Sequence, residues 1–236
     1  MSTLLVSRME SGEPELFASV QGEGASMGMA STFVRLAVCN LRCSWCDTAY
    51  TWDWARFDRA AQVMTLESDA IAALVANLPP RNVVVTGGEP LIQRRQLVPL
   101  AEQLGERGFR IEIETNGTIA PAELDGLVDQ FNVSPKLRHS GNEGLTRIRD
   151  DVLSAFAATS RAYFKFVIAE PNDLSEVAGI MANVAVAPDR IILMPEGRSP
   201  AELGARSGWL AEACVARGYR FSTRLHVLLW GDTRGV

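Results

Sequence analysis

The alternation of short β-branched runs with helical patterns, from about residue 81 onward, is the feature that most constrains the fold. Residues 82–86 (NVVVT) form a continuously apolar run that stops at Gly87, which predicts a buried strand. Residues 97–107 carry leucines at helical spacing, and Gly108 is a stop signal that predicts the end of this helix. Residues 109–114 (FRIEIE) then alternate between apolar and polar, which predicts the next strand.

The same alternation extends over most of the chain. Further strands are predicted over 32–38, 131–134, 162–168, 190–194 and 220–228, and further helices over 68–78 and 199–217. Residues 47–67, rich in Trp, Asp and Arg, predict an irregular loop or a short insertion. No internal repeat interrupts the pattern, so we expect one domain over residues 1–236.

Strands that alternate with helices indicate parallel pairing with right-handed crossovers. About six or seven units are too few for the closed eight-stranded barrel. The sequence therefore predicts an α/β fold with a partial, open TIM barrel of the (β/α)6 type, and a doubly wound sheet is the alternative. In both folds, functional side chains are expected at the carboxyl ends of the strands.

Composition excludes several classes of protein. With 236 residues, 47% of them hydrophobic and 22% charged, the chain is able to bury a sizeable core and is not intrinsically disordered. The formal net charge of −5 argues against a broad basic surface for nucleic acid. Because no apolar run approaches about 20 residues and the start lacks a leader pattern, we expect a cytoplasmic protein without a membrane partner.

Three of the four cysteines lie within eight residues, at CxxxCxxC spacing: Cys39, Cys43 and Cys46. A loop with this spacing is able to wrap three thiolates around zinc or an iron–sulfur cluster. Structural zinc normally takes four protein ligands, and no fourth Cys or His is near in the sequence. Three ligands on a four-iron cluster would leave one iron open. Cys214 lies on the apolar face of a predicted helix, which indicates packing.

This spacing, with an aromatic residue before the last cysteine, resembles the radical S-adenosylmethionine superfamily. The resemblance implies that the three thiolates hold a [4Fe–4S] cluster, that S-adenosylmethionine chelates the open iron, and that Trp45 packs near the adenine. Residues 87–90 (GGEP) resemble the second motif of the superfamily, in which Gly88 and Glu89 would meet the methionine amino group. Glycine permits close backbone approach, and a carboxylate suits an ammonium.

Further segments narrow the resemblance. They are FASVQGEG (17–24), FVRL (33–36), CDT (46–48), VTGGEP (85–90), ETNG (114–117), VSPK (133–136) and RLHVLLWGDTRGV (224–236). In this order they resemble the 7-carboxy-7-deazaguanine synthase family of queuosine and deazapurine biosynthesis. The resemblance implies conversion of 6-carboxy-5,6,7,8-tetrahydropterin to 7-carboxy-7-deazaguanine with loss of ammonia. It also implies Mg²⁺ dependence, a homodimer, and a small flavodoxin or ferredoxin as electron donor.

The resemblance assigns roles to named residues. The expected substrate-binding residues are Val20, Gln21, Gly22, Glu23, Arg35, Thr86 and Val236. The expected S-adenosylmethionine-binding residues are Trp45, Cys46, Asp47, Gly88, Glu89, Ser134, Pro135 and Lys136. Arg35 is suited to a bidentate pair with the substrate carboxylate. Thr48 would give a hydroxyl to Mg²⁺, and the segment 220–236 would close the active site.

No acid or base side chain is expected to carry the chemistry, because the reaction is driven by a radical formed at the cluster. The alternative enzyme is a glycyl-radical activating enzyme of the same superfamily, which would act on a protein partner. The VQGEG and FVRL segments favour a small carboxylated ligand instead. A remote alternative is a non-enzymatic module that binds metal or RNA.

Overall fold

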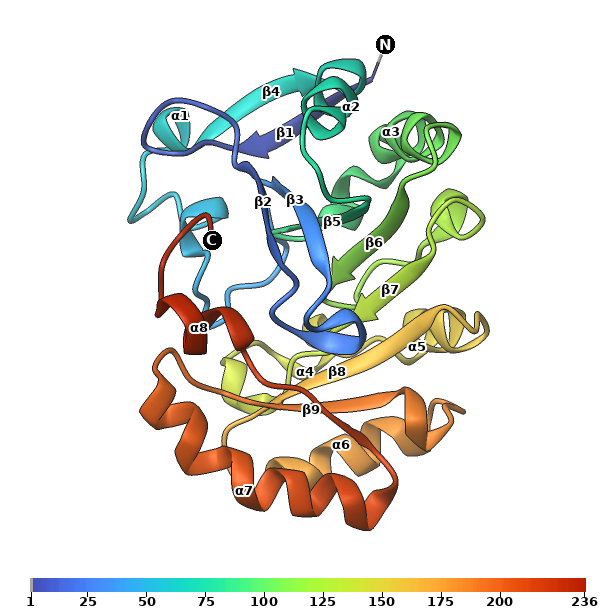
Figure 1. Cartoon of the computed structure of the whole chain (residues 1–236). Coiled ribbons are helices and arrows are strands. Elements are labelled where there is room, and N and C mark those ends of the chain that lie inside the picture. Colours follow the sequence, from blue (N-terminus) through green and yellow to red (C-terminus); the bar gives the residue numbers. More distant parts are fainter. Residues whose placement is uncertain (1) are drawn as a thin grey trace.

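Ten strands form one curved sheet in the computed structural model, which describes residues 2–236 (Figure 1). The strands are β1 (Thr3–Ser7), β2 (Leu16–Val20), β3 (Ala30–Leu36), β4 (Val63–Glu67), β5 (Asn82–Gly87), β6 (Arg110–Thr115), β7 (Gln130–Val133), β8 (Ala162–Ile168), β9 (Ile191–Pro195) and β10 (Arg220–Phe221). Their order is β10-β9-β8-β7-β6-β5-β3-β1-β4, and β2 pairs with β3.

The run from β3 to β10 is parallel throughout, whereas β1, β2 and β4 add antiparallel pairs at one edge. Within residues 2–236 no pairing joins β10 to β4, so the barrel is open. The prediction of a single α/β domain with a partial, open barrel is confirmed, and the doubly wound alternative is not adopted.

Helices lie along the outer side of the sheet (Figure 1). The α-helices are α1 (Arg59–Gln62), α2 (Ser68–Ala76), α3 (Arg94–Glu106), α4 (Gly144–Arg147), α5 (Asp150–Ala157), α6 (Asp173–Ala182), α7 (Pro200–Arg217) and α8 (Leu225–Trp230). Short 3₁₀ turns are η1 (Gly24–Ser26), η2 (Ala49–Thr51), η3 (Pro90–Gln93), η4 (Ala122–Leu124), η5 (Arg138–Ser140) and η6 (Pro188–Arg190). Among the described residues, no helix is both long and apolar enough to span a bilayer.

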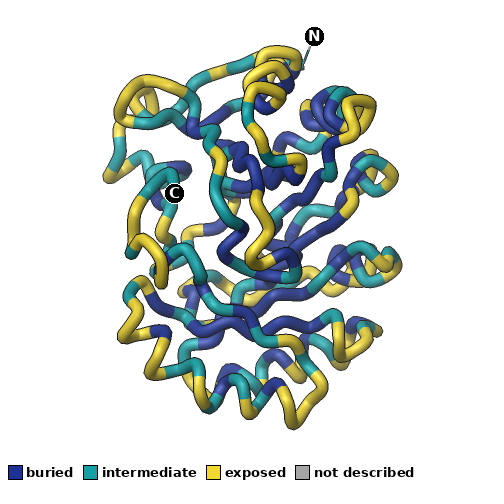
Figure 2. The backbone as a smooth tube through the Cα atoms, in the orientation of Figure 1, coloured by how far each residue is buried: buried dark blue, intermediate teal, exposed yellow. Residues whose placement is uncertain are grey.

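The hydrophobic core lies between the helices and the outer face of the sheet, where buried residues concentrate in Figure 2. The Phe131 and Phe156 rings meet edge to face, with centroids 5.3 Å apart. Cys214 on α7 is 2% exposed and belongs to this core, as its helix face predicts. The inner side of the sheet also carries buried polar side chains, including Glu112 and Asn132, and these bond to each other.

Two predicted segments differ from the structure. The strand expected over 220–228 is wrong: β10 ends at Phe221, and residues 225–230 form α8, because a short apolar run fits a helix as well as a strand. Residues 47–67 are not wholly irregular, since Val63–Glu67 forms β4 in register with β1, with Leu4 opposite Leu66. The sheet thereby gains antiparallel strands at one edge, which the parallel pattern does not predict.

Candidate active site

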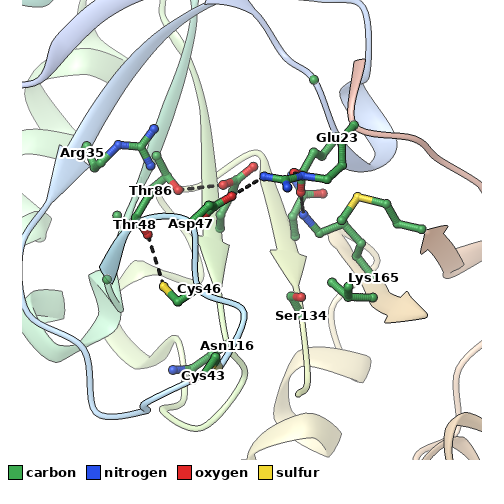
Figure 3. Close-up of a pocket in the computed structure, with 18 of the residues that line it drawn as sticks. Glu23, Arg35, Cys43, Cys46, Asp47, Thr48, Thr86, Asn116, Ser134 and Lys165 are labelled. Atoms are coloured by element: carbon green, nitrogen blue, oxygen red, sulfur yellow. Dashed lines mark hydrogen bonds and ion pairs between the residues drawn. The ribbon is translucent and has the colours of Figure 1, made fainter. Parts of the chain in front are cut away.

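One pocket opens at the carboxyl ends of the parallel strands (Figure 3). Successive strands contribute to its wall: Arg35 from β3, Thr86 from β5, Glu114 from β6, Asn132 from β7 and Lys165 from β8. The cluster loop (residues 39–46) and the segment after β10 complete the lining. Residues that are far apart in the sequence therefore meet where this class of fold places its chemistry.

All three cysteines of the cluster loop line the pocket, and none forms a disulfide. Each sulfur accepts one N–H group: Cys39 from Leu41 (3.4 Å), Cys43 from Asn142 (3.3 Å) and Cys46 from Trp52 (3.3 Å). Burial raises the pKa of Cys39 to about 12 and also raises the pKa of Cys43. Thiols in such surroundings ionise when they ligate a cation, and N–H donors to sulfur suit an iron–sulfur cluster.

Gly88 allows the end of β5 to approach the start of the cluster loop. A Cβ atom on Gly88 would lie 2.1 Å from the carbonyl oxygen of Val38. That oxygen accepts the backbone N–H of Glu89 at 2.8 Å. Val38 itself has a φ of 78°, an uncommon conformation for a β-branched residue. Glycine at position 88 therefore allows the backbone of Val38, which precedes Cys39, to pack closely against the end of β5.

Glu89 does not reach the pocket in this structure. Its side chain is fully buried and accepts three hydrogen bonds, from the backbone N–H of Leu91 (3.0 Å), the backbone N–H of Asn116 (2.6 Å) and the hydroxyl of Thr115 (2.8 Å). Burial raises the pKa of Glu89. The carboxylate holds the turn after β6 instead of facing a ligand. Pro135 is the other expected cofactor residue outside the lining.

Arg35 is held so that its outer end stays available. Its Nε donates to Glu15 Oε1 at 2.7 Å, and its terminal nitrogens make no hydrogen bond within residues 2–236. Thr86 lies near it and donates its hydroxyl to Glu114 at 2.6 Å (Figure 3). A guanidinium that is anchored by one nitrogen and free at the other two suits a carboxylate ligand.

The segment after β2 faces the pocket, with Val20, Gln21, Gly22 and Glu23 all in the lining. The Gln21 amide donates to both Glu112 and Glu114 at 3.1 Å, so its two N–H groups are used inside the protein. Gln21 therefore offers a ligand no free side-chain donor.

Glu23 stands between two cations, Lys165 and Arg224. Arg224 Nε lies 3.0 Å from Glu23 Oε1, and Lys165 Nζ pairs with Oε2. Burial by itself raises the pKa of Glu23, but the two cations outweigh it and hold that pKa well below its usual range. Glu23 is therefore ionised, and the pair of cations balances its charge.

The pocket lining also includes residues that were not assigned a role from the sequence, among them Lys165, Arg224 and His226. Arg224 also pairs with Asp47, the expected cofactor residue, and donates to the carbonyl of Gly197 at 2.9 Å. The sequence does contain an indication for Lys165, because this lysine is the one charged residue in the otherwise apolar strand AYFKFVI. Arg224 and His226 lie in the segment 220–236 that was expected to close the active site, but the sequence assigned neither residue a role of its own.

Gly22 is the contact point for His226. A Cβ atom on Gly22 would lie 2.1 Å from His226 Nδ1, so the chain needs glycine at this position. Burial lowers the pKa of His226, although the nearby Glu23 opposes the shift. The imidazole is therefore neutral at pH 7, and its Nε2 accepts from Arg224 Nη2 at 3.4 Å.

Trp45 and Lys136 lie together on the cluster side of the pocket. The Lys136 ammonium is 5.5 Å from the Trp45 ring centroid and donates to Ser134 Oγ at 3.0 Å. Trp45 Nε1 donates to His139 Nδ1 at 3.0 Å, which fixes the plane of the indole. His139 is a further residue to which sequence reasoning assigned no role. An aromatic face beside a hydroxyl and an ammonium suits a nucleoside with a charged side group.

The expected magnesium residue Thr48 also lines the pocket, with Oγ1 3.6 Å from Cys46 Sγ. Within residues 2–236 no three His, Cys, Asp or Glu side chains surround a single metal-ion position. Mg²⁺ commonly keeps several waters and takes one or two protein oxygens, so one hydroxyl beside a carboxylate ligand suits it. Val236 lies in the same lining.

Comparison with known proteins gives consistent results. The model of the radical SAM superfamily matches residues 34–181. A 7-carboxy-7-deazaguanine synthase from Pyrobaculum aerophilum is 40% identical over 223 residues, which cover 94% of this chain and 95% of the relative. A 7-carboxy-7-deazaguanine synthase from Halobacterium salinarum is 36% identical and covers 92% and 90%.

Solved structures agree with this result. The crystal structure of QueE from Escherichia coli superposes with a TM-score of 0.70 at 27% identity and covers 95% of both chains. Streptococcus suis SuiB bound to S-adenosylmethionine has a TM-score of 0.56 at 14% identity, covering 78% of this chain and 48% of its own. The latter similarity concerns the fold alone. The chain thus belongs to the radical SAM superfamily and, within it, to the 7-carboxy-7-deazaguanine synthase family.

Proposed function

We propose that this chain converts 6-carboxy-5,6,7,8-tetrahydropterin to 7-carboxy-7-deazaguanine with loss of ammonia, in a reaction that requires Mg²⁺. The observation that carries the proposal is that the three thiols of the cluster loop and the free end of Arg35 face one pocket. A cation for a carboxylate and ligands for a radical-generating cluster are thereby combined in a single site. Family membership supports the same reaction.

The residues of the chain divide this work. Cys39, Cys43 and Cys46 would hold a [4Fe–4S] cluster, to which S-adenosylmethionine binds. When bound, these two groups supply the 5′-deoxyadenosyl radical that removes a hydrogen atom from the substrate carbon bearing the carboxylate. Arg35 and a Thr48-bound Mg²⁺ would hold that carboxylate. The contribution of the protein is positioning and exclusion of water.

S-adenosylmethionine would lie along the Trp45 side of the pocket. The indole face and the Ser134 hydroxyl fit a nucleoside, and the backbone at Gly88 allows close approach. Asp47 would act here through its ion pair with Arg224. Lys136, which is in contact with both Trp45 and Ser134, would place a positive charge next to the bound S-adenosylmethionine.

The substrate would lie between Arg35 and the segment after β2. Backbone groups of Val20 and Gly22, the ionised Glu23 and the hydroxyl of Thr86 offer polar contacts for the pterin edge. We also propose a small flavodoxin or ferredoxin as electron donor, a homodimeric state, and a cytoplasmic location, all of which are typical of the family. Nucleic acid and membranes are not proposed as partners.

The test uses the anaerobically reconstituted full chain with a reductant, S-adenosylmethionine, Mg²⁺ and the pterin. We expect 7-carboxy-7-deazaguanine by mass spectrometry, and loss of product after removal of Mg²⁺ with a chelator. Cys43→Ala is expected to lose iron and turnover, whereas Cys214→Ala keeps both. Cleavage of S-adenosylmethionine without any deazaguanine product would overturn the substrate assignment and favour an activating enzyme. A colourless protein with one zinc and no iron would overturn the radical chemistry itself.

A further inference from the structure

A single buried carboxylate joins the arginine of the pocket to an arginine near the end of the chain. Glu15 is 0% exposed. Its Oε1 accepts from Arg35 Nε (2.7 Å) and from the Tyr50 hydroxyl (2.9 Å), and its Oε2 accepts from Arg234 Nη2 (2.7 Å) and from Ser7 (2.9 Å). Each oxygen of this one side chain thus accepts from a guanidinium and from a hydroxyl, and the two guanidinium groups belong to the pocket wall and to segment 231–236.

Arg234 makes several polar contacts within the protein. Besides Glu15, its guanidinium donates to the carbonyl of Arg8 at 2.7 Å and to Gln62 Oε1 at 3.2 Å. Its central carbon lies 3.6 Å from the centroid of the Tyr50 ring. A planar guanidinium with five donors is able to make this set of contacts, whereas an ammonium is not. The arrangement is that of an anchored residue and not of a solvated surface charge.

The chain then turns from this anchor toward the pocket. Gly235 has a φ of 81°, and a Cβ atom there would lie 2.9 Å from Cε of Met9. Both the backbone conformation and the close contact favour glycine at this position. The next residue, Val236, lines the pocket. Figure 1 shows this final red segment returning from α8 to lie beside the cyan segment that contains η2.

A second ion pair on the same segment provides a contrast. Arg198 Nε lies 2.8 Å from Asp232 Oδ2, but the two side chains are 48% and 39% exposed. Exposed pairs of this kind contribute little to stability, whereas a buried carboxylate shared by two guanidinium groups depends strongly on each partner. Because both pairs involve an arginine and a carboxylate, a comparison of the two arginines tests the effect of burial.

We propose that Arg234 and Glu15 are positioning residues of the active site: together they latch segment 231–236 against β1 and η2, and so fix both Arg35 and the pocket wall at Val236. This inference rests on the proposed function, because it gives the latch a role in binding the carboxylated substrate. Loss of Arg234 frees one oxygen of Glu15, and Arg35 is then no longer held in a single orientation. The wall at Val236 opens in the same step.

The test compares Arg234→Ala, Arg234→Lys and Arg198→Ala in the full, cluster-loaded chain. The first readout is hydrogen exchange of peptides within 225–236, measured without substrates. We expect Arg234→Ala to speed this exchange by at least about tenfold, the size of effect of one charged hydrogen bond. The exchange rate of Arg234→Lys should lie between those of the parent and Arg234→Ala, and the rate of Arg198→Ala should stay within about twofold of the parent.

The second readout is the KM for the pterin, set against kcat and against the KM for S-adenosylmethionine. Arg234→Ala is expected to raise the pterin KM about tenfold, with little change in the KM for S-adenosylmethionine and at unchanged iron content. Because loss of a partner of the buried Glu15 carboxylate also lowers the melting temperature, the kinetics are measured at a temperature at which every variant is fully folded. Equal exchange in the Arg234 and Arg198 variants would overturn the latch, and faster exchange with an unaltered pterin KM would overturn its role in binding. If the parent forms no product, the proposed function fails, but the exchange comparison still decides whether the latch exists.

Discussion

Substitution of Gly88 by alanine tests the close approach between β5 and the cluster loop. The added Cβ would lie 2.1 Å from the carbonyl oxygen of Val38 and 2.5 Å from its carbonyl carbon. Both atoms are backbone, so no side-chain rotation relieves the overlap. Contacts below about 3 Å force movement of about 1 Å, and forced overpacking of this kind costs about 3 kcal/mol or more.

The movement would also stretch two hydrogen bonds, Gly88 N–H to the Leu36 carbonyl (3.1 Å) and Glu89 N–H to the Val38 carbonyl (2.8 Å). For a chain of this size, about 3 kcal/mol corresponds to a drop in Tm of about 6–12 °C. The assay is thermal unfolding of the cluster-free chain by circular dichroism, followed by iron counting after reconstitution. We expect both the lower Tm and a lower iron content, because Cys39 follows Val38 directly.

Gly105 provides the matched control. It lies inside α3, and a Cβ atom there would meet nothing within 4 Å. Gly105→Ala should raise stability by about 0.5–1 kcal/mol through helix propensity and lower entropy of the unfolded chain. If Gly88→Ala melts within about 2 °C of the parent and still loads iron fully, the close approach has no energetic importance and the reasoning is refuted.

Three further predictions concern buried groups. Burial by itself would raise the pKa of Glu15, but the charges of Arg35 and Arg234 outweigh burial, so the pKa in the folded state lies below the unfolded value of 4.5. The Glu15→Gln substitution should therefore lower the free energy of unfolding, measured in urea at pH 7, by about 3 kcal/mol. The carboxylate stabilises the fold above pH 4.5 and loses this effect as the pH falls through the folded pKa, so an equal cost at pH 3 would contradict the assignment. Glu89→Gln should cost about 1–3 kcal/mol, because the new NH₂ group opposes an N–H donor; an unchanged urea midpoint would contradict its anchoring role. Cys214→Ala should cost about 1 kcal/mol and retain all iron, and loss of iron there would place that thiol at the cluster.

Sequence patterns predicted the parallel strands from β3 to β9 well, because these segments are short apolar or alternating runs separated by turn signals. The strand over 162–168 agrees with β8 residue for residue. The antiparallel edge was not predicted, since β1 and β4 are partnered by contacts between segments about sixty residues apart. The end of the chain was mispredicted because the sequence LHVLLW has no period that separates helix from strand.

At the candidate site, the sequence identified the residues that belong to motifs and missed those recruited by tertiary structure. The cluster loop, Arg35 and Trp45 meet in one pocket as predicted. Arg224 and Lys165 could not be assigned, because their importance arises from their partner Glu23 on a distant segment. Glu89 is a motif residue whose carboxylate accepts from the backbone N–H groups of Leu91 and Asn116 and from the Thr115 hydroxyl, and the motif alone does not predict these contacts.

The connections across the pocket mouth also bear on the order of folding. From β5 to β9 each strand pairs with its successor in the chain, so this part of the sheet is able to grow by local steps. The contacts of Gly24 with Ser222 and of Glu23 with Arg224 instead join residues 198 and 201 positions apart. Closing such long loops is entropically unfavourable until the sheet holds both ends near each other. During refolding, the amides around the pocket mouth should therefore become protected only after those of β5–β9.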